Sequence, residues 1–280
     1  MEVLKLQYQD PVGMSIDYLR QFEPEEGYWL ANSYGKDSIV VEDLCKVAGV
    51  KYESHHCHTS ADHPKLIYFG RKYYPDTIVD KSEWTMWNII PVKGVSTRIR
   101  RFCCSYLKER GGEGRFTITG VRKAESANRR KNRGLLETFA AKKEDKILFN
   151  DNDDDRKIIE ICAFKGKRVL NPIIHWSDED VWNYIKSRNL PYCSLYDEGY
   201  KRLGCIGCPM SYNRVFELKQ NPKYYNAYLR AFDRLIQNRL KTRESFRWKT
   251  AQDVMNWWIY EMPKQEPGQM ELEFEDEDED

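Results

Sequence analysis

The first half of the chain alternates between short apolar runs and stretches whose apolar residues recur at helical spacing. A helical pattern over residues 14–22 precedes a short apolar run at 28–31, which predicts a strand. A polar, glycine-containing turn at residues 32–36 leads into a second helical pattern that ends at Gly49. A further strand is expected at 52–58, before a helix that Pro64 opens. This order predicts an α/β fold with a parallel twisted sheet and flanking helices.

The second half adds a strand, an irregular segment and a helical region. Residues 116–119 predict a strand that ends at Gly120, and the short β-like runs between 146 and 170 predict a hairpin at an edge of the sheet, around an acidic turn at 150–155. Ser177 begins a capping box, and Thr250 is expected to cap another helix after the helical pattern of 224–240. We therefore expect a sheet-containing domain over residues 1–210, a C-terminal helical extension over 211–264 and a disordered acidic tail over 265–280.

Charge is distributed unevenly along the chain. The 280 residues include 45 Lys and Arg and 44 Asp and Glu, a formal net charge of +1, but eight of the acids fall within the last ten residues. The rest of the chain therefore carries a net charge of +9. This excess suits a polyanionic partner, although phosphate-bearing small ligands would account for part of it. The acidic tail either competes with such a partner or simply keeps the protein in solution.

Cysteine usage points to metal or redox chemistry. No apolar run approaches the roughly 20 residues of a membrane-spanning helix, and the first residues do not resemble a secretory signal. We therefore expect a cytoplasmic protein without a membrane partner, in a compartment where cysteines seldom form disulfides. Four of the eight cysteines are scattered singly among apolar neighbours and are interpreted as packing residues: Cys45, Cys57, Cys162 and Cys193.

The hexapeptide S-Y-G-K-D-S lies between a predicted strand and a predicted helix, where backbone N–H groups and the helix dipole favour an anion. Gly35 allows close approach of a phosphate, Lys36 supplies charge, and Asp37 suits Mg²⁺ coordination or helix capping. The spacing is not that of a Walker A loop. An ordinary strand–turn–helix with a capping residue is the alternative. The predicted phosphate loop consists of Ser33, Tyr34, Gly35, Lys36, Asp37 and Ser38.

Several stretches, in chain order, resemble the PP-loop ATP pyrophosphatases and especially their branch related to phosphoadenylyl-sulfate (PAPS) reductase. The loop is similar to S-G-G-x-D-S, with Tyr34 in place of the first glycine, and residues 119–126 with Arg129 are similar to G-[ILV]-R-x-x-E-S-x-x-R. N-P-I-I-H-W-S at 171–177, D-V-W at 180–182 and L-Y-D-E-G-Y at 195–200 continue the likeness. The resemblance spans about residues 25–215. It implies a PP-loop, adenine-nucleotide alpha-hydrolase-like fold, with 1–210 as the nucleotide-binding domain.

The resemblance also implies an adenine nucleotide, ATP or PAPS, as the ligand. Lys36 and Asp37 would be catalytic through the phosphates and Mg²⁺, and Arg122 and Arg129 would form guanidinium forks against phosphate or sulfate oxygens, one of them oriented by Glu125. A solvated basic face is the alternative for the outer residues of 129–133. Residues 58–62 would contact the nucleoside, and the remaining histidines are expected at the surface rather than at a metal. Beyond the loop, the predicted nucleotide-binding residues are Thr59, Gly120, Arg122, Glu125, Ser126 and Arg129.

Two cysteine pairs, about a hundred residues apart, predict a four-thiolate site formed by Cys103, Cys104, Cys205 and Cys208. A C-x-x-C flanked by glycines is a chelating turn, and a second thiol pair completes four ligands. Zinc is the generic alternative, although adjacent cysteines fit a tetrahedral zinc ion poorly. The pattern resembles the [4Fe-4S] ligation of adenylyl-sulfate reductases, so we favour iron–sulfur over zinc.

The expected reaction follows from where the resemblance stops. Sulfonucleotide reductases carry a nucleophilic cysteine in a K-x-E-C-G-[IL]-H context, whereas no cysteine follows Cys208 here. The Lys-Asp-Ser of the loop is closer to ATP-cleaving members. We therefore expect ATP-dependent adenylylation and cluster-assisted sulfur transfer, as enzymes of DNA phosphorothioation and tRNA thiolation perform. DNA or tRNA is the candidate substrate, contacted by 98–101, 129–133 and 239–249, and a sulfur donor or thiol protein is the candidate partner.

Two alternatives remain at this point. One is a PAPS or adenylyl-sulfate reductase that uses an external thiol. The other is a non-catalytic nucleic-acid-binding protein with a structural metal site, against which the intact Lys36 and Asp37 argue.

Overall fold

The computed structural model describes residues 10–98, 100–109, 111–139, 147–149, 167–242 and 247–261. The chain divides into two compact units. Unit 1 comprises Met1–Cys57, Pro64–Asp80 and Arg110–Leu203, and unit 2 comprises His58–His63, Lys81–Glu109 and Gly204–Asp280. Residues 1–210 contribute to both units, and the functional borders expected at 210 and 264 stay a prediction.

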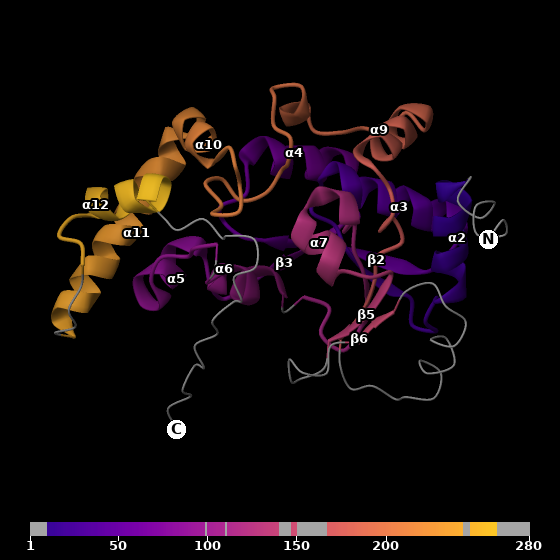
Figure 1. Ribbon diagram of the computed structural model, residues 1–280, viewed down its shortest axis with the longest axis horizontal. Coiled ribbons are helices and arrows are strands. Elements are labelled where there is room, and N and C mark those ends of the chain that lie inside the picture. Colours follow the sequence, from indigo (N-terminus) through magenta and orange to yellow (C-terminus); the bar gives the residue numbers. More distant parts are fainter. Residues whose placement is uncertain are drawn as a thin grey trace. The chain divides into compact units, whose positions relative to one another are not determined.

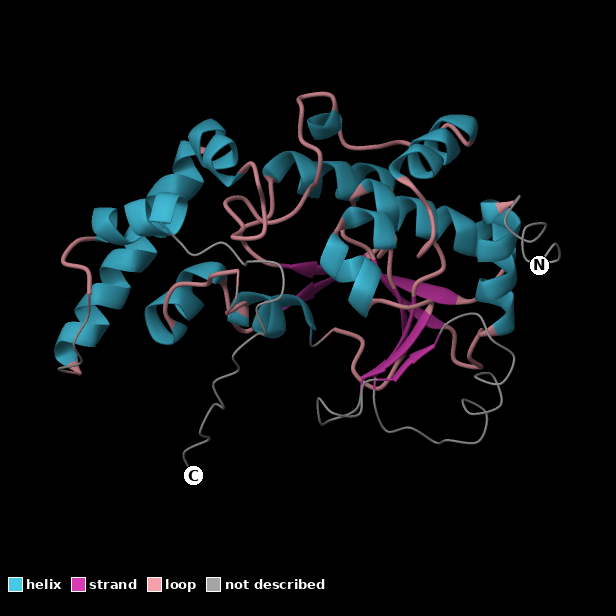
Figure 2. Cartoon of the chain, viewed as in Figure 1, coloured by secondary structure: helices cyan, strands magenta, loops and turns pink. Residues whose placement is uncertain are grey.

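The described residues form a seven-stranded sheet in the order β3-β2-β1-β4-β7-β5-β6. The chain pairs β1 in parallel with β2 and with β4, and β4 in parallel with β7, whereas β5 is antiparallel to both β7 and β6. The expected α/β fold with a mostly parallel sheet and flanking helices is confirmed (Figure 2). The strands are β1 (Tyr28–Ala31), β2 (Tyr52–His58), β3 (Ile78–Lys81), β4 (Phe116–Ile118), β5 (Leu136–Phe139), β6 (Ile147–Phe149) and β7 (Lys167–Leu170).

The expected edge hairpin is partly wrong. The short strand β6 does lie at an edge of the sheet, but its antiparallel partner is β5, which the sequence pattern did not reveal. The second β-like run, β7, lies inside the sheet and runs parallel to β4. Runs of three or four residues have the same local pattern at an edge and in the interior, so periodicity alone does not place them. The acidic turn at 150–155 lies outside the described residues.

Local capping chemistry sets the ends of the helices in unit 1. The helix α2 (Pro11–Gln21) begins three residues before its predicted start, because the Asp10 side chain accepts hydrogen bonds from the N–H groups of Val12 and Gly13. The helix α3 (Lys36–Ala48) ends at Gly49, as expected, with a left-handed φ of 72° that glycine adopts at little cost. The remaining helices of unit 1 are α4 (Pro64–Tyr73), η2 (Lys123–Glu125), α7 (Ala127–Asn132), α9 (Asp178–Ser187), which has the expected Ser177 capping box, and η4 (Ser194–Tyr196). Of these helices, α3, α4 and α9 lie on one side of the sheet (Figure 1).

The strand order reverses beside β1. The chain leaves β1 through α3 to reach β2 on one side, whereas β4 lies on the other side of β1. Because β1, β4 and β7 are parallel, their carboxyl ends meet at the same edge of the sheet. In open α/β sheets, ligands bind at such a reversal of strand order. The loops that follow β1, β4 and β7 are therefore where a site is expected.

Unit 2 is built from helices around its own apolar core. The long helix α11 packs against α5 and α12, with Phe232, Leu235 and Trp258 fully buried. The expected helix over 224–240 and the Thr250 cap are both confirmed. In the part of the chain that the structure describes, no helix is long and apolar enough to cross a bilayer. The helices of unit 2 are α5 (Met86–Lys93), α6 (Phe102–Cys104), η1 (Ser105–Glu109), α10 (Arg214–Gln220), α11 (Pro222–Lys241), α12 (Ala251–Asn256) and η5 (Trp257–Glu261).

Tyr34 is the unusual member of the loop between β1 and α3. Its φ of 59° lies in the left-handed region, where a glycine would be unstrained and a side chain costs about 1–2 kcal/mol. Tyr34 is 2% exposed, and its ring stacks on that of His56, with ring centroids 4.2 Å apart and 16° between the planes. A Cβ added to Gly70 of α4 would lie 2.4–2.5 Å from three ring atoms. The ring therefore occupies space that is available because position 70 has no side chain. His56 is buried as well, so the expectation that it lies at the surface is wrong.

This contact predicts the effect of filling the slot. Gly70→Ala should destabilise unit 1 by about 1–3 kcal/mol, because the added methyl group overpacks the Tyr34 ring. In a Tyr34→Gly background the same substitution should stabilise by about 0.5–1 kcal/mol, because alanine favours a helix more than glycine does. Urea unfolding of the four proteins measures both values. An equal cost in the two backgrounds would show that the Tyr34 ring does not limit position 70.

Candidate functional site

Four charged side chains form a closed ring of hydrogen bonds in the loops after β1, β4 and β7. Lys36 Nζ donates to Asp37 Oδ1 at 3.1 Å and to Asp178 Oδ1 at 2.9 Å. Arg122 Nε donates to Asp37 Oδ1 at 2.7 Å, and its Nη2 donates to Asp178 Oδ1 at 2.6 Å. We call Lys36, Asp37, Arg122 and Asp178 the charge ring. Two cations face two anions, so the ring has no formal net charge.

Burial makes this pairing necessary. Arg122 is 1% exposed and Lys36 is 6% exposed, and an unpaired charge at either position would be strongly destabilising. A third hydrogen bond, from Arg122 Nη1 to the carbonyl oxygen of Trp176 at 3.2 Å, fixes the guanidinium plane. The hydrogen bond from Lys36 is the largest of the effects that lower the pKa of Asp178, so this carboxyl is ionised at neutral pH. Because the Asp178 side chain is 71% exposed, it is the ring member most open to solvent.

Asn32 fixes the backbone of the loop between β1 and α3 through hydrogen bonds. Its Oδ1 accepts a hydrogen bond from the Tyr34 N–H at 2.8 Å and from Ser38 Oγ at 3.1 Å. Its Nδ2 donates to Glu42 Oε2 at 2.5 Å, and burial raises the pKa of Glu42. The loop conformation is thus tied to a buried polar network, and Ser38 serves that network. Sequence reasoning missed Asn32, because a single asparagine before a turn has an ordinary capping explanation.

A second anchor comes from the loop after α9. Tyr196 Oη accepts a hydrogen bond from the Lys36 N–H at 2.9 Å, and burial raises the pKa of this phenol. A Cβ added to Gly35 would lie 3.4 Å from the same oxygen and 3.3 Å from Ser33 Oγ. Tyr196 was not a predicted site residue, although the L-Y-D-E-G-Y element that carries the resemblance contains it.

Gly120 lies against the start of α3. A Cβ at this position would be 2.8 Å from the carbonyl carbon of Asp37 and 3.0 Å from its Cβ. Any larger residue would push the end of β4 away from the loop. The structure therefore places Gly120 beside the predicted phosphate loop and gives a steric reason for a glycine there.

Glu125 and Ser126 shape the segment that follows β4. Glu125 Oε2 accepts hydrogen bonds from the Arg122 N–H at 3.0 Å and from Arg129 Nη1. Ser126 caps α7, and its Oγ accepts from the Arg129 N–H at 3.1 Å. Burial, helped by the charge of Arg202, lowers the pKa of Arg129 to about 10. The expected orienting role of Glu125 thus fits Arg129, whereas the Arg122 guanidinium is oriented by the charge ring.

The four predicted metal ligands lie in unit 2 and are close enough to affect one another. Cys103 and Cys104 belong to α6, and the Cys208 N–H donates to the Cys205 carbonyl oxygen at 3.2 Å. A hydrogen bond from Cys103 is the largest effect that lowers the pKa of Cys104, to about 6. Burial raises the pKa of Cys205 to about 11, and the Cys208 charge adds to this rise. The hydrogen bond to Cys104 and burial raise the pKa of Cys103, and the charge of Cys205 adds a smaller rise that links the two pairs electrostatically.

The surroundings of these thiols supply compensating charge. Negative charge on Cys205 is the largest of the effects that raise the pKa of Lys108, with smaller effects from Asp62, Cys104 and Cys208. Cys103 is buried and Cys104, Cys205 and Cys208 are half-buried, and the charge of Lys108 acts on them. Four sulfur donors with a nearby cation match the ligand chemistry of a [4Fe-4S] cluster, whose four iron ligands are cysteine thiolates. Sequence reasoning missed Lys108, and the available signal was a lysine a short helical segment after the cysteine pair.

Thr59 belongs to unit 2 and not to the unit that contains the loop. Its Oγ1 lies 3.3 Å from Cys205 Sγ, and its N–H donates to Asp62 Oδ2 at 2.8 Å. The predicted contact between Thr59 and a nucleotide stays a prediction. Among the cysteines interpreted as packing residues, Cys45 and Cys193 are buried and Cys57 is half-buried, while Cys162 lies outside the described residues.

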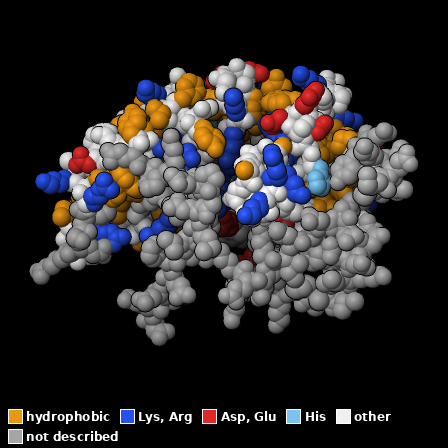
Figure 3. Space-filling model, in the orientation of Figure 1, with side chains coloured by type: hydrophobic (Ala, Val, Ile, Leu, Met, Phe, Trp, Pro, Cys, Tyr) orange, Lys and Arg blue, Asp and Glu red, His pale blue; other side chains and the backbone are white. Residues whose placement is uncertain are grey.

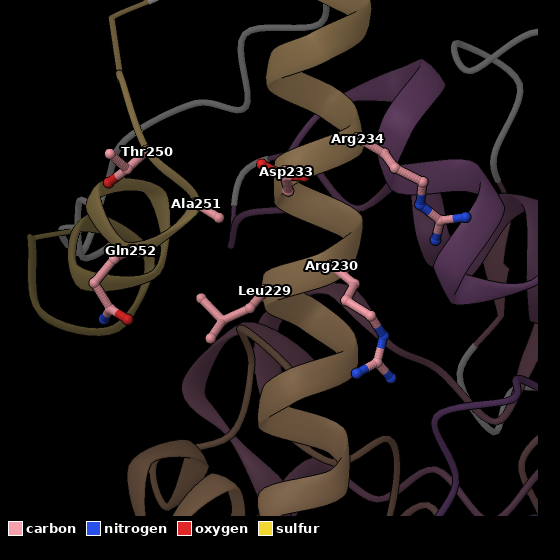
Figure 4. Close-up of a pocket in the computed structure, with 7 residues that line it drawn as sticks. All are labelled: Leu229, Arg230, Asp233, Arg234, Thr250, Ala251 and Gln252. Atoms are coloured by element: carbon pink, nitrogen blue, oxygen red, sulfur yellow. The ribbon is translucent and has the colours of Figure 1, made fainter.

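A hollow of about 700 Å³ lies between α11 and α12 (Figure 4). None of the predicted site residues lines it. Its lining consists of Leu229, Arg230, Asp233, Arg234, Thr250, Ala251 and Gln252.

Comparison with known proteins gives the family. The family model described as "Phosphoadenosine phosphosulfate reductase domain" matches residues 27–211. An adenosine 5'-phosphosulfate reductase of Oceanobacillus iheyensis is 36% identical over 91 residues, which is 32% of this chain and 28% of that protein. An uncharacterised protein of Methanocaldococcus jannaschii is 30% identical over 195 residues, 65% of this chain and 41% of that protein. The matches therefore span less than half the length of these two relatives.

A solved structure shows a further, weaker likeness. The PAPS reductase of Candida auris has a TM-score of 0.47 and 18% identity, and the alignment covers 71% of this chain and 90% of that one. The family model, in contrast, covers more than half of the sequence. On that match, the chain belongs to the phosphoadenosine phosphosulfate reductase domain family.

Proposed function

We propose that this protein binds Mg-ATP at the charge ring, transfers AMP to an oxygen of its substrate and replaces that oxygen with sulfur. The observation that most supports ATP as the nucleotide is the charge balance of the ring, where two carboxylates, Asp37 and Asp178, contact the same two cations. The four cysteines of unit 2 would hold a [4Fe-4S] cluster on their thiolates, and this cluster would assist the sulfur transfer.

The neutral ring favours a phosphate that arrives with its own metal ion. A metal-free sulfonucleotide brings negative charge next to two carboxylates, and like charges in one site disfavour each other. Mg²⁺ is held by carboxylates together with substrate phosphates. In a Mg-ATP complex, Lys36 and the Arg122 fork would bind phosphate oxygens while Asp37 binds the metal. The cations of the ring then contact phosphate, and its carboxylate Asp37 contacts the metal ion.

The chemistry assigned to these residues is the stabilisation of charge. A substrate oxygen attacks the α-phosphorus, the bond to the β-phosphate breaks, and pyrophosphate leaves with Mg²⁺. Positively charged groups that are already held in place stabilise such a transition state without reorganisation. A sulfur donor at the oxidation level of hydrosulfide then displaces AMP, so the two steps require no net oxidation or reduction. The +9 charge outside the tail supports a nucleic acid as the acceptor.

A sulfonucleotide reductase that uses an external thiol is the second candidate, favoured by the adenosine 5'-phosphosulfate reductases among the relatives. One experiment separates the two. Anaerobically purified protein is given ATP with a nucleic-acid acceptor, and separately PAPS or adenosine 5'-phosphosulfate with a thiol. Pyrophosphate release supports the proposal, and sulfite release replaces it with the reductase. A protein that turns over neither nucleotide would be the non-catalytic binder.

Removal of the loop charges should affect binding and turnover differently. Lys36→Ala should weaken Mg-ATP binding by about 10- to 100-fold, because charge-assisted hydrogen bonds of about 1.5–3 kcal/mol are lost. Asp37→Ala should mainly abolish Mg-dependent pyrophosphate release. Calorimetry and a pyrophosphate assay measure the two effects, with the exposed Lys51→Ala as the matched control. Unchanged affinity in Lys36→Ala would place the nucleotide elsewhere.

Charge removal at Asp178 should change selectivity. Asp178→Asn leaves Lys36 and Arg122 with one carboxylate, so metal-free pyrophosphate should bind about fivefold more tightly, a gain of about 1 kcal/mol at an exposed position. Mg-ATP should gain little, because its charge is already reduced by the metal. The control is Glu179→Gln in the same first turn of α9. If both variants respond alike, the ring does not select for the metal complex.

Each cysteine ligand should be required for the cluster. Anaerobically prepared wild-type protein should contain iron and inorganic sulfide and be brown, as expected of a thiolate-bound Fe–S centre. Serine at Cys103, Cys104, Cys205 or Cys208 should lower the iron content and the visible absorbance, whereas Cys57→Ser in unit 1 should not. Stoichiometric zinc without iron in a native preparation would assign the site to zinc instead.

A further inference from the structure

The positive charge of this protein is concentrated in unit 2. The three segments of unit 1 contain 28 Lys and Arg against 27 Asp and Glu, whereas the segments of unit 2 as far as Glu261 contain 16 against 8. Figure 3 shows several Lys and Arg side chains over the region of α11. The +9 outside the acidic tail therefore resides almost entirely in unit 2, which contains the four predicted ligand cysteines.

Part of this charge follows one line along α11. Lys223, Arg230, Arg234 and Lys241 are separated by 7, 4 and 7 positions, and all four are exposed. At 3.6 residues per turn these positions project within about 20° of a common direction and extend over about 27 Å. The opposite face of the helix buries Tyr228, Phe232 and Leu235. We call the four cations the α11 stripe. Figure 4 shows Arg230 and Arg234 on the same side of α11, away from Thr250 and Gln252.

Acidic side chains do not neutralise the stripe. Among the described residues, its members form no ion pair, and Arg234 Nη2 donates to the carbonyl oxygen of Trp87 in α5 at 2.7 Å. The acid of α11, Asp233, lies about 80° away from the stripe and accepts a hydrogen bond from Gln237 at 2.9 Å. Solvent-exposed helices commonly place opposite charges three or four residues apart, and like charges at this spacing, as at 230 and 234, are destabilising. A line of unpaired cations therefore suggests a ligand that neutralises it.

We propose that the α11 stripe binds the phosphate backbone of a nucleic acid, and this rests on the proposed function in taking a nucleic acid as the sulfur acceptor. Four cations over about 27 Å suit a regular row of phosphates, which a nucleic-acid strand provides, better than a single nucleotide. The stripe consists of Lys and Arg without an aromatic side chain among them. This composition is typical of a surface that contacts phosphates and makes no sequence-specific base contacts. The binding is thus independent of sequence and positions the substrate.

The test compares two triple variants with the same loss of charge. Lys223→Gln/Arg230→Gln/Lys241→Gln removes the stripe members that make no described contact, and Lys51→Gln/Arg71→Gln/Lys186→Gln removes three exposed cations from unit 1. Fluorescence anisotropy with a short DNA duplex and an RNA hairpin measures affinity across a salt series. For the duplex, loss of three phosphate contacts should reduce the salt slope by about 2.7, so the affinity advantage of wild type should shrink roughly 40-fold between about 50 and 200 mM salt.

Each outcome has a definite meaning. A stripe variant that loses salt-dependent affinity while the control variant does not supports the proposal. Equal losses in both variants would show that net charge alone determines binding, which overturns it. If the wild-type protein binds neither the DNA duplex nor the RNA hairpin, the proposal is also overturned. Binding of an acidic peptide with the sequence of residues 271–280 would not change that conclusion. The proposed nucleotide chemistry is scored separately by Mg-ATP binding and iron content, which both triple variants should retain.

Discussion

The pairing of Arg122 with two carboxylates is the interaction on which the candidate nucleotide site depends. A guanidinium that is 1% exposed would be strongly destabilising without partners, and Asp37 and Asp178 provide them from two other loops. Lys36 joins the same carboxylates, so movement of any one loop would remove partners from a buried charge. The charge ring therefore connects three loops that are far apart in sequence.

Topology brings these loops together although they are far apart in sequence. Asp37 follows β1, Arg122 follows β4 and Asp178 follows β7, and the three strands are adjacent and parallel. A parallel sheet places every such loop at one edge, and ligands of open α/β sheets bind where the strand order reverses, as it does beside β1. The close packing of Gly120 on Asp37 shows how little space separates the first two loops. The ring is thus a consequence of strand order together with three short sequence elements.

Sequence reasoning succeeded where a local signal existed. Gly49 ends α3, and Ser177 and Thr250 cap helices at the predicted positions. The strands β1 and β2 have the predicted limits. It failed where the decisive partner is distant in sequence. Whether β7 lies inside the sheet depends on its pairing with β4 and β5, which no local pattern encodes. Asp178 has an ordinary explanation as an acid in the first turn of a helix, so its contact with Lys36, 142 positions away in the chain, was not visible.

Under the proposed function, the two units differ in the charge balance of the surfaces that bind phosphate. In unit 1 the cations are matched one to one by carboxylates, so strong binding requires a ligand that brings a metal ion of its own. In unit 2 the cations of the α11 stripe are in surplus, so attraction to a polyanion is long-ranged and weakens with salt. A nucleotide site without net charge attracts the backbone of a nucleic acid only weakly. A row of widely spaced cations likewise attracts one compact Mg-ATP only weakly. Charge balance alone can therefore direct two phosphate-bearing ligands to different parts of one chain.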